Sequence, residues 1–214
     1  MVAFLSLGEL TLMRSVKFAV AAMMALSLAA CGQPKAFQAL PDDMEMGNKD
    51  AKITVVEYAS VGCPICAKWQ ADVWPAFKAK YVDTGKVHYV FREMLVGGTE
   101  EVTVAAGGFL LARCAGKDKY FAVNDAIFAA QPAIFYSPRE TLSDIAKSVG
   151  MNEDQFQKCV SDEAQMTALN TRVQNNAKVH EVNATPTFEI NGRKMEPGYH
   201  SLAEIDAAIE SAGK

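Results

Sequence analysis

Two cysteines separated by two residues carry the clearest chemistry in this sequence. They stand at the ends of the run Cys63-Pro64-Ile65-Cys66. Two thiols at this spacing can close into a small disulfide ring or open to a dithiol, so the pair can carry two electrons. A pair that cycles in this way is typical of an enzyme that exchanges disulfides with other proteins. A static structural bridge is the alternative.

The residues before this pair predict that Cys63 lies at the start of a helix. Residues 53–58 are rich in β-branched and aromatic side chains and predict a buried strand. A short turn follows, and Pro64 favours the first turn of a helix. The free N–H groups and the positive dipole at a helix N-terminus favour a thiolate. We therefore expect Cys63 to be the nucleophile and Cys66, one turn further inside, to be the shielded resolving cysteine.

Glu57 stands six positions before Cys63, within the predicted buried strand. Burial of a carboxyl group raises its pKa, because the charged form loses its hydration. A protonated Glu57 beneath the turn could exchange a proton with Cys66, directly or through water. The alternative is a carboxylate at the strand end that faces solvent.

The rest of the chain predicts strands at both ends of a helical block. The helix from Cys63 carries an apolar stripe and should kink at Pro75, and a second strand covers residues 87–91. Residues 99–181 have the patterning of several helices, with Pro138 at one helix start. Residues 187–190 and 194–196 form a predicted hairpin around Asn191-Gly192, followed by a final helix over residues 201–212.

In this order, the features resemble the DsbA-type thiol oxidoreductases of the thioredoxin superfamily. Three features carry the resemblance: Glu57 followed by the Cys63–Cys66 pair, the Thr185-Pro186 step before a hairpin, and the helical block between two strand regions. The resemblance implies a thioredoxin fold, in which helices flank a central mixed sheet, with an inserted all-helical domain. It also implies that Pro186 is a cis-proline and that Thr185 and Pro186 pair with the backbone of a bound substrate. The alternative is an ordinary trans-proline in a loop.

Two residues depart from the pattern of the best-known DsbA proteins. Ile65 stands where those proteins have a histidine between the cysteines, and Thr185 stands where they have valine. An imidazolium would help to hold the thiolate, whereas isoleucine cannot. We therefore expect a weaker oxidant than a protein with a Cys-Pro-His-Cys pair. A dithiol oxidase is the first hypothesis. The alternatives are a disulfide reductase or isomerase, or a chaperone-like peptide-binding lipoprotein whose two cysteines form a static bridge.

The N-terminal residues have the pattern of an export signal. Arg14 and Lys17 precede a charge-free apolar run at residues 18–30, which is short for a membrane-spanning helix. The run ends in Leu28-Ala29-Ala30-Cys31-Gly32, which resembles a bacterial lipobox and predicts lipidation at Cys31. Ordinary signal cleavage, with Cys31 left as a spare thiol, is the alternative. We expect translation to begin at Met13 and the mature protein to be periplasmic and membrane-anchored.

The five cysteines can all be assigned in an exported protein, where disulfides persist. After Cys31, Cys63 and Cys66 are assigned, Cys114 and Cys159 remain, and both fall within the helical block. We expect a structural disulfide between them, with two separate buried thiols as the alternative.

The predicted organisation is a signal peptide at residues 1–30, a lipid-attachment cysteine and linker at residues 31–48, and two parts of the thioredoxin fold at residues 49–97 and 182–214 around a helical insert at residues 98–181.

Composition and charge exclude several other classes of protein. The net charge is −4 and no basic run is present, so nucleic-acid binding is not expected. The three histidines do not stand at metal-ligand spacing, and no second Cys-x-x-Cys pair accompanies the first, so neither a metal nor a cofactor is expected. The expected partners are cysteine-containing proteins or peptides and a DsbB-like or DsbD-like redox protein of the membrane. We expect a monomer.

Overall fold

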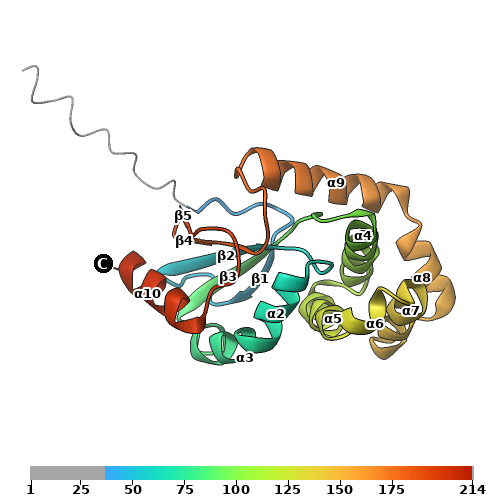
Figure 1. The fold of residues 1–214 in the computed structure, drawn as a ribbon, viewed down its shortest axis with the longest axis horizontal. Coiled ribbons are helices and arrows are strands. Elements are labelled where there is room, and N and C mark those ends of the chain that lie inside the picture. The colour runs from blue at the N-terminus through green and yellow to red at the C-terminus, as the bar shows by residue number, and fades with distance from the viewer. Residues whose placement is uncertain (1–36, 214) are drawn as a thin grey trace, which may run out of the picture. The chain divides into compact units, whose positions relative to one another are not determined.

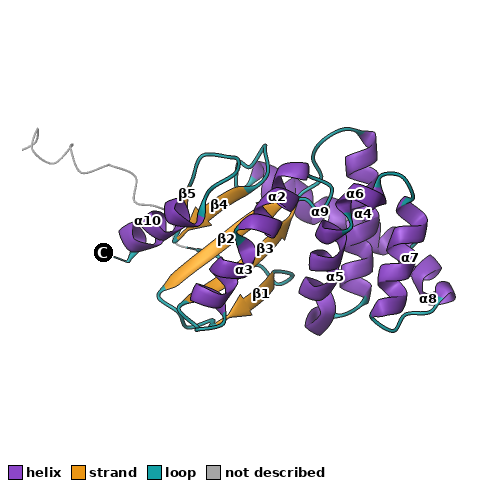
Figure 2. Cartoon of the chain, turned by 60° about the horizontal axis from the view of Figure 1, so that its bottom comes forward, coloured by secondary structure: helices purple, strands orange, loops and turns teal. Residues whose placement is uncertain are grey.

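The computed structural model describes residues 37–213 of the chain. Within these residues, a five-stranded sheet lies beside a group of helices (Figures 1 and 2). The strands are β1 (Met44–Gly47), β2 (Ile53–Ala59), β3 (Val87–Glu93), β4 (Thr187–Ile190) and β5 (Arg193–Lys194). Their order across the sheet is β1-β3-β2-β4-β5, with β2 and β3 parallel and the other neighbours antiparallel. The sheet is therefore mixed, as the resemblance implies.

Both faces of the central strand β2 are buried. Successive side chains of a strand point to opposite faces, so Val55 and Glu57 lie on one side and Val56 and Tyr58 on the other. Val55 belongs to the main hydrophobic core, together with Trp69 of the helix that follows the cysteine pair. Val56 and Tyr58 belong to a second, smaller core. This continuous burial explains why residues 53–59 show no alternation of apolar and polar side chains.

The helix after the cysteine pair is interrupted where the sequence predicts a kink. Helix α2 (Pro64–Asp72) ends at Val73, α3 (Trp74–Phe77) follows, and a π-helical turn covers Lys78–Val82. Pro75 has no backbone N–H and cannot continue the hydrogen-bond pattern of α2. Trp69, Trp74 and Phe77 nevertheless contact one another and cover the sheet.

Six helices lie between β3 and β4 and form the helical block. They are α4 (Thr99–Cys114), α5 (Lys117–Ala129), α6 (Gln131–Ile134), α7 (Pro138–Ser148), α8 (Glu153–Val160) and α9 (Glu163–Lys178). Helix α7 begins at Pro138, as predicted, and α8 begins with a capping box between Asn152 and Gln155. Figure 1 shows α9 running from α8 back to the sheet, where it contacts β3. The last helix, α10 (Leu202–Ala212), contacts β4.

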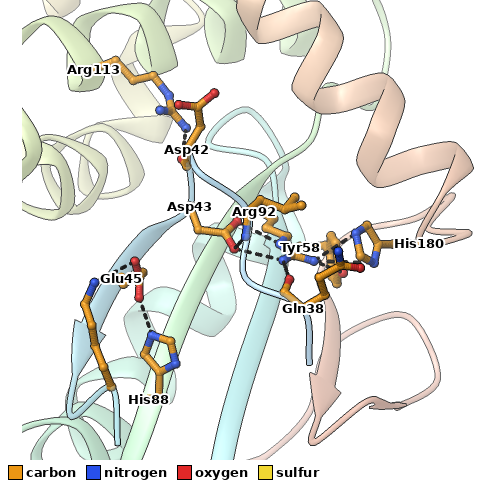
Figure 3. A network of polar contacts seen from close by, with 11 residues as sticks. Gln38, Asp42, Asp43, Glu45, Tyr58, His88, Arg92, Arg113 and His180 are labelled. Atoms are coloured by element: carbon orange, nitrogen blue, oxygen red, sulfur yellow. Dashed lines mark hydrogen bonds and ion pairs between the residues drawn. The ribbon is translucent and has the colours of Figure 1, made fainter. Parts of the chain in front are cut away.

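The prediction of a linker over residues 31–48 is wrong at its C-terminal end. Met44–Gly47 form the edge strand β1, which pairs with β3, so the sheet begins before residue 49. The segment before β1 is held by buried Arg92, whose guanidinium binds both carboxylate oxygens of Asp43 at 2.9 Å and the Gln38 carbonyl at 2.8 Å (Figure 3). The sequence does not predict this strand, because the strand is short and the strand with which it pairs, β3, lies more than forty residues away.

The predicted second strand of the hairpin is also displaced. It covers Arg193–Lys194 rather than residues 194–196. Pro197 stands three positions after the end of this strand. The chain then turns toward the loop at Thr185-Pro186, where the Gly198 N–H donates to the Pro186 carbonyl at 2.8 Å. Within residues 37–213, no helix combines the length and the hydropathy that a membrane span requires.

Candidate active site

Cys63 lies at the N-terminus of α2, where the sequence places it. It is the N-cap residue, with extended backbone angles, and Pro64 occupies the first helical position. Cys63 keeps a relative exposure of 9%, whereas Cys66 has none. Ile65, between them, is 48% exposed. An outside reagent therefore meets Cys63 and Ile65 first, and Cys66 lies behind them.

The surroundings of Cys63 stabilise its thiolate. The Cys66 thiol donates a hydrogen bond to the Cys63 sulfur, and this is the largest cause of a pKa lowered to about 5. Partial burial opposes the shift, while Thr185 and the backbone N–H groups of Cys66 and Ile65 add to it. These N–H groups are the free donors of the helix N-terminus. Cys63 therefore carries a thiolate at neutral pH.

Cys66 has the opposite character. Burial raises the pKa of its thiol above the ordinary value, and the neighbouring Cys63 raises it further. The pair is asymmetric, with an ionised outer sulfur and a protonated inner one. The two sulfurs are not bonded to each other in this structure, which corresponds to the reduced form of the pair.

The loop at Thr185-Pro186 lies against the outer cysteine. The peptide bond between these two residues is cis. The Cys63 sulfur lies 3.6 Å from the Thr185 carbonyl oxygen, although 122 residues separate them in sequence. Thr185 is buried, and apart from its interaction with the two cysteine sulfurs its hydroxyl has no hydrogen-bond partner among the described residues. The fold thus brings together the two motifs that the sequence shows far apart.

Glu57 is completely buried on the face of β2 that carries the main core. Burial raises its pKa to about 8, partly offset by a hydrogen bond that the Tyr89 hydroxyl donates to Oε2. The negative charges of Asp125 and Cys63 raise the pKa further. Its other oxygen, Oε1, has no partner among the described residues. Glu57 is therefore a protonated acid at neutral pH, and it responds to the charge on Cys63.

Tyr89 is a site residue that the sequence reasoning missed. It lies on β3 and faces the same core as Glu57, next to Trp74 and Phe77. In the parallel register Val55 pairs with Tyr89 and Glu57 pairs with Phe91, so Tyr89 stands diagonally opposite Glu57. Only knowledge of this register could have linked the two residues, because the sequence shows Tyr89 as one more aromatic residue in a strand.

The remaining predicted site residues lie elsewhere. Cys114, at the end of α4, forms a disulfide with Cys159 of α8, within the helical block. Cys31, the predicted lipidation site, lies outside the described residues. Among residues 37–213, no group of three or more histidine, cysteine or acidic side chains is arranged to hold a metal ion.

Comparison with known proteins places the chain in a family. A family model described as thioredoxin matches residues 39–211. The chain belongs to the thioredoxin family. Two curated relatives carry the words "Putative protein-disulfide oxidoreductase" in their names. The Rickettsia bellii protein is 36% identical over 174 residues, and the Rickettsia conorii protein is 33% identical over 179 residues. The matches cover 80% and 82% of this chain but only 64% and 62% of those proteins. The chain thus spans under two thirds of the length of these relatives.

Among solved structures, the thioredoxin-family chain is similar to α-DsbA1 from Wolbachia pipientis. The two share 27% sequence identity with a TM-score of 0.74, over 83% of this chain and 94% of that one. These findings confirm a DsbA-like member of the thioredoxin superfamily. They also confirm the predicted fold, a thioredoxin fold with an inserted helical domain.

Proposed function

We propose that this protein is a thiol–disulfide oxidoreductase that exchanges disulfides with cysteine-containing proteins or peptides through Cys63 and Cys66. The observation that carries the proposal is the asymmetry of the pair, in which the pKa of Cys63 falls to about 5 and that of Cys66 rises. A thiolate is the species that attacks a disulfide, and a thiolate also leaves readily from one. The outer sulfur is therefore suited to both steps of an exchange.

The proposed direction is oxidation of the substrate. A substrate thiolate attacks the Cys63 sulfur of the oxidised pair, the bond between Cys63 and Cys66 breaks, and Cys66 leaves and takes up a proton. A second substrate thiolate then attacks the mixed disulfide and releases the Cys63 thiolate. The substrate loses two electrons and the protein gains them. A stabilised thiolate favours this direction, because it stabilises the dithiol form of the protein, an effect for which DsbA proteins are the standard example.

Glu57 is the proposed proton donor to Cys66, and the acceptor in the reverse step. Its pKa of about 8 keeps it protonated at neutral pH. Cys66 is fully buried and cannot take its proton from bulk water at the surface. The Cys63 charge raises the pKa of Glu57, so the two groups respond to each other during the cycle.

The cis-proline loop is the proposed site for the substrate backbone. The Thr185 carbonyl lies beside the Cys63 sulfur, and exposed Ile65 lies on the same turn as that sulfur. An extended peptide that pairs with this loop would bring its cysteine to Cys63. Because Ile65 cannot supply a positive charge, we propose a milder oxidant than a protein with histidine at this position.

The remaining parts of the proposal concern the cellular setting. We propose that the protein acts in the periplasm, anchored through lipidated Cys31, and that a DsbB-like membrane protein reoxidises the Cys63–Cys66 pair. Export to an oxidising compartment is consistent with the Cys114–Cys159 disulfide. Reduction of substrates would instead require a DsbD-like electron donor.

A trapping experiment tests the roles of the two cysteines. We expect Cys66→Ala to accumulate a covalent complex with a disulfide-containing peptide through Cys63, because no second thiol can resolve it. The matched variant Cys63→Ala should accumulate none. Mass spectrometry of the nonreduced complexes identifies the linked cysteine. A complex through Cys66, or alkylation of Cys66 alone in the reduced protein, would refute these roles.

Equilibration of the active pair with glutathione tests the direction. We expect the pair to be more oxidising than glutathione, and a more reducing pair would favour the reductase alternative. A potential below about −300 mV is typical of structural disulfides and would favour a static bridge in a peptide-binding protein. A second experiment measures the rate at which the protein oxidises a reduced peptide during its refolding, with Cys63→Ser as the control.

A further inference from the structure

The inserted helical domain contacts the active-site turn through one buried side chain. Gln131 begins α6 and is only 6% exposed. Its side-chain amide donates hydrogen bonds to the carbonyl oxygens of Val61 at 2.8 Å and Cys63 at 3.1 Å. An amide nitrogen carries two N–H donors, so both of them are used on this turn. The two accepting residues flank Gly62.

The same turn is pressed against a second helix of the insert. A Cβ atom at Gly62 would lie 2.2 Å from the backbone oxygen of Glu101 in α4. A Cβ atom at Gly108, also in α4, would lie 3.0 Å from Val61 Cγ2. The turn is therefore closely packed on the α4 side and hydrogen-bonded on the α6 side. The hydrogen bonds from Gln131 constrain the orientation of the peptide groups in this turn.

The Cys63 carbonyl is where the turn joins helix α2. This oxygen also accepts the Ala67 N–H at 3.0 Å, which is the first hydrogen bond of the helix. The Cys63 N–H donates to the Ser60 carbonyl at 3.0 Å. Gln131 thus fixes the peptide group that sets the direction of the Cys63 side chain relative to the start of the helix. The N–H groups of Ile65 and Cys66, which favour the thiolate, belong to that same helical turn.

We propose that Gln131 is a positioning residue for the Cys63 thiolate. Through its two hydrogen bonds, the inserted domain holds the turn so that the first N–H groups of α2 point at the sulfur. The side chain is uncharged, so it acts through geometry and not through its own charge. The inference rests on the proposed function, since it concerns the reactive sulfur of that function.

The test measures the thiolate itself and needs no substrate. Gln131→Met keeps the length of the side chain but removes both donors, and Gln131→Asn keeps the amide but withdraws it by one methylene. Thiolate absorbance at 240 nm between pH 3 and 9, with the spectrum of the oxidised protein subtracted, gives the pKa of Cys63. The raised pKa of Cys66 keeps that thiol outside the lower part of this range. Gln157→Met is the matched control, because Gln157 lies in the same insert but its amide binds exposed Glu153.

We expect both Gln131 variants to raise the pKa of Cys63 by about 0.5 to 1, the size of one lost hydrogen bond. The equilibrium constant with glutathione should fall by roughly threefold to tenfold in the same variants. Gln157→Met should change neither quantity. Gln131→Asn disturbs the packing least and serves if Gln131→Met does not fold.

One result would contradict the positioning role of Gln131, and a different result would contradict the proposed function. A folded Gln131 variant whose Cys63 pKa and glutathione equilibrium match those of the wild type would overturn the positioning role alone. An ordinary pKa for Cys63 in the wild-type protein would instead remove the basis of the proposed function.

Discussion

The most informative residue for solution measurements is Glu57, because its protonation links catalysis to stability. Its ordinary pKa of 4.5 rises to about 8 in the folded protein, chiefly through burial. The folded protein therefore binds this proton more tightly than the unfolded chain does. The resulting contribution to stability is complete below about pH 4.5 and is lost as the pH rises through 8.

This linkage gives the first stability prediction. Between pH 5 and 9, the oxidised wild-type protein should lose on the order of 3 to 5 kcal/mol of unfolding free energy relative to Glu57→Gln. The oxidised form is used because Cys63 cannot titrate when it is bonded to Cys66. Burial, the largest cause of the raised pKa of Glu57, acts in this form as well, whereas the smaller contribution of the Cys63 charge is absent. Urea unfolding at a series of pH values measures the difference. Parallel pH profiles of the two proteins would show that Glu57 ionises normally.

The pair of cysteines shows how neighbouring residues of one type acquire different chemistry. Cys63 and Cys66 are three positions apart, yet the pKa of one falls and that of the other rises. The hydrogen bond between the two sulfurs, their unequal burial, the Thr185 loop and the helix N-terminus cause this difference. The sequence predicts the helix terminus, whereas the contact with Thr185 requires the folded sheet.

Among the elements, α4 and α8 are joined covalently. The Cys114–Cys159 disulfide closes a loop over a sequence separation of 45 within the helical block. We predict that the double variant Cys114→Ser/Cys159→Ser loses about 2 to 4 kcal/mol of unfolding free energy, because its unfolded chain is less restricted. Denaturant unfolding without reductant measures this loss. An unchanged midpoint would mean that the bridge adds no stability.

The helices and strands also show where local patterns predict structure well. Pro75 marks the break between α2 and α3, Pro138 starts α7, and Asn191-Gly192 marks the hairpin turn. These signals depend on residues close together in sequence. The edge strand β1 was missed because its stability comes from pairing with β3 and from the Arg92–Asp43 ion pair, both distant contacts (Figure 3).

Across the whole molecule, one buried carboxylate joins the sheet to the helical block. Glu93 ends β3, and its oxygens bind Arg113 of α4 at 2.6 Å and Arg172 of α9 at 2.7 Å. The Tyr120 hydroxyl of α5 also donates to Glu93. Asn176 of α9 donates to the Glu93 backbone carbonyl. The orientation of the insert relative to the sheet therefore depends on this cluster.

Glu93→Gln should be strongly destabilising. It leaves Arg113 and Arg172 partly buried without their anion, and removing one partner from such a cluster costs about 3 kcal/mol. Asp144→Asn is the matched control, because Asp144 forms an exposed pair with Lys147 and its loss should leave stability unchanged. Thermal or denaturant unfolding measures both variants. Equal stability of Glu93→Gln and wild type would show that the cluster does not hold the insert.

The sequence by itself determined the redox pair, its place at a helix start, the acid in the preceding strand, and the alternation of strand and helix regions. Each of these depends on residue type and short spacing, which act through local backbone preferences and hydrophobic burial. Only the tertiary structure decided that Tyr89 binds Glu57, that Thr185 lies against Cys63, and that Gln131 holds the active-site turn. Such contacts join residues 32 to 122 positions apart, and their geometry is set by strand register and helix packing, which no local pattern specifies.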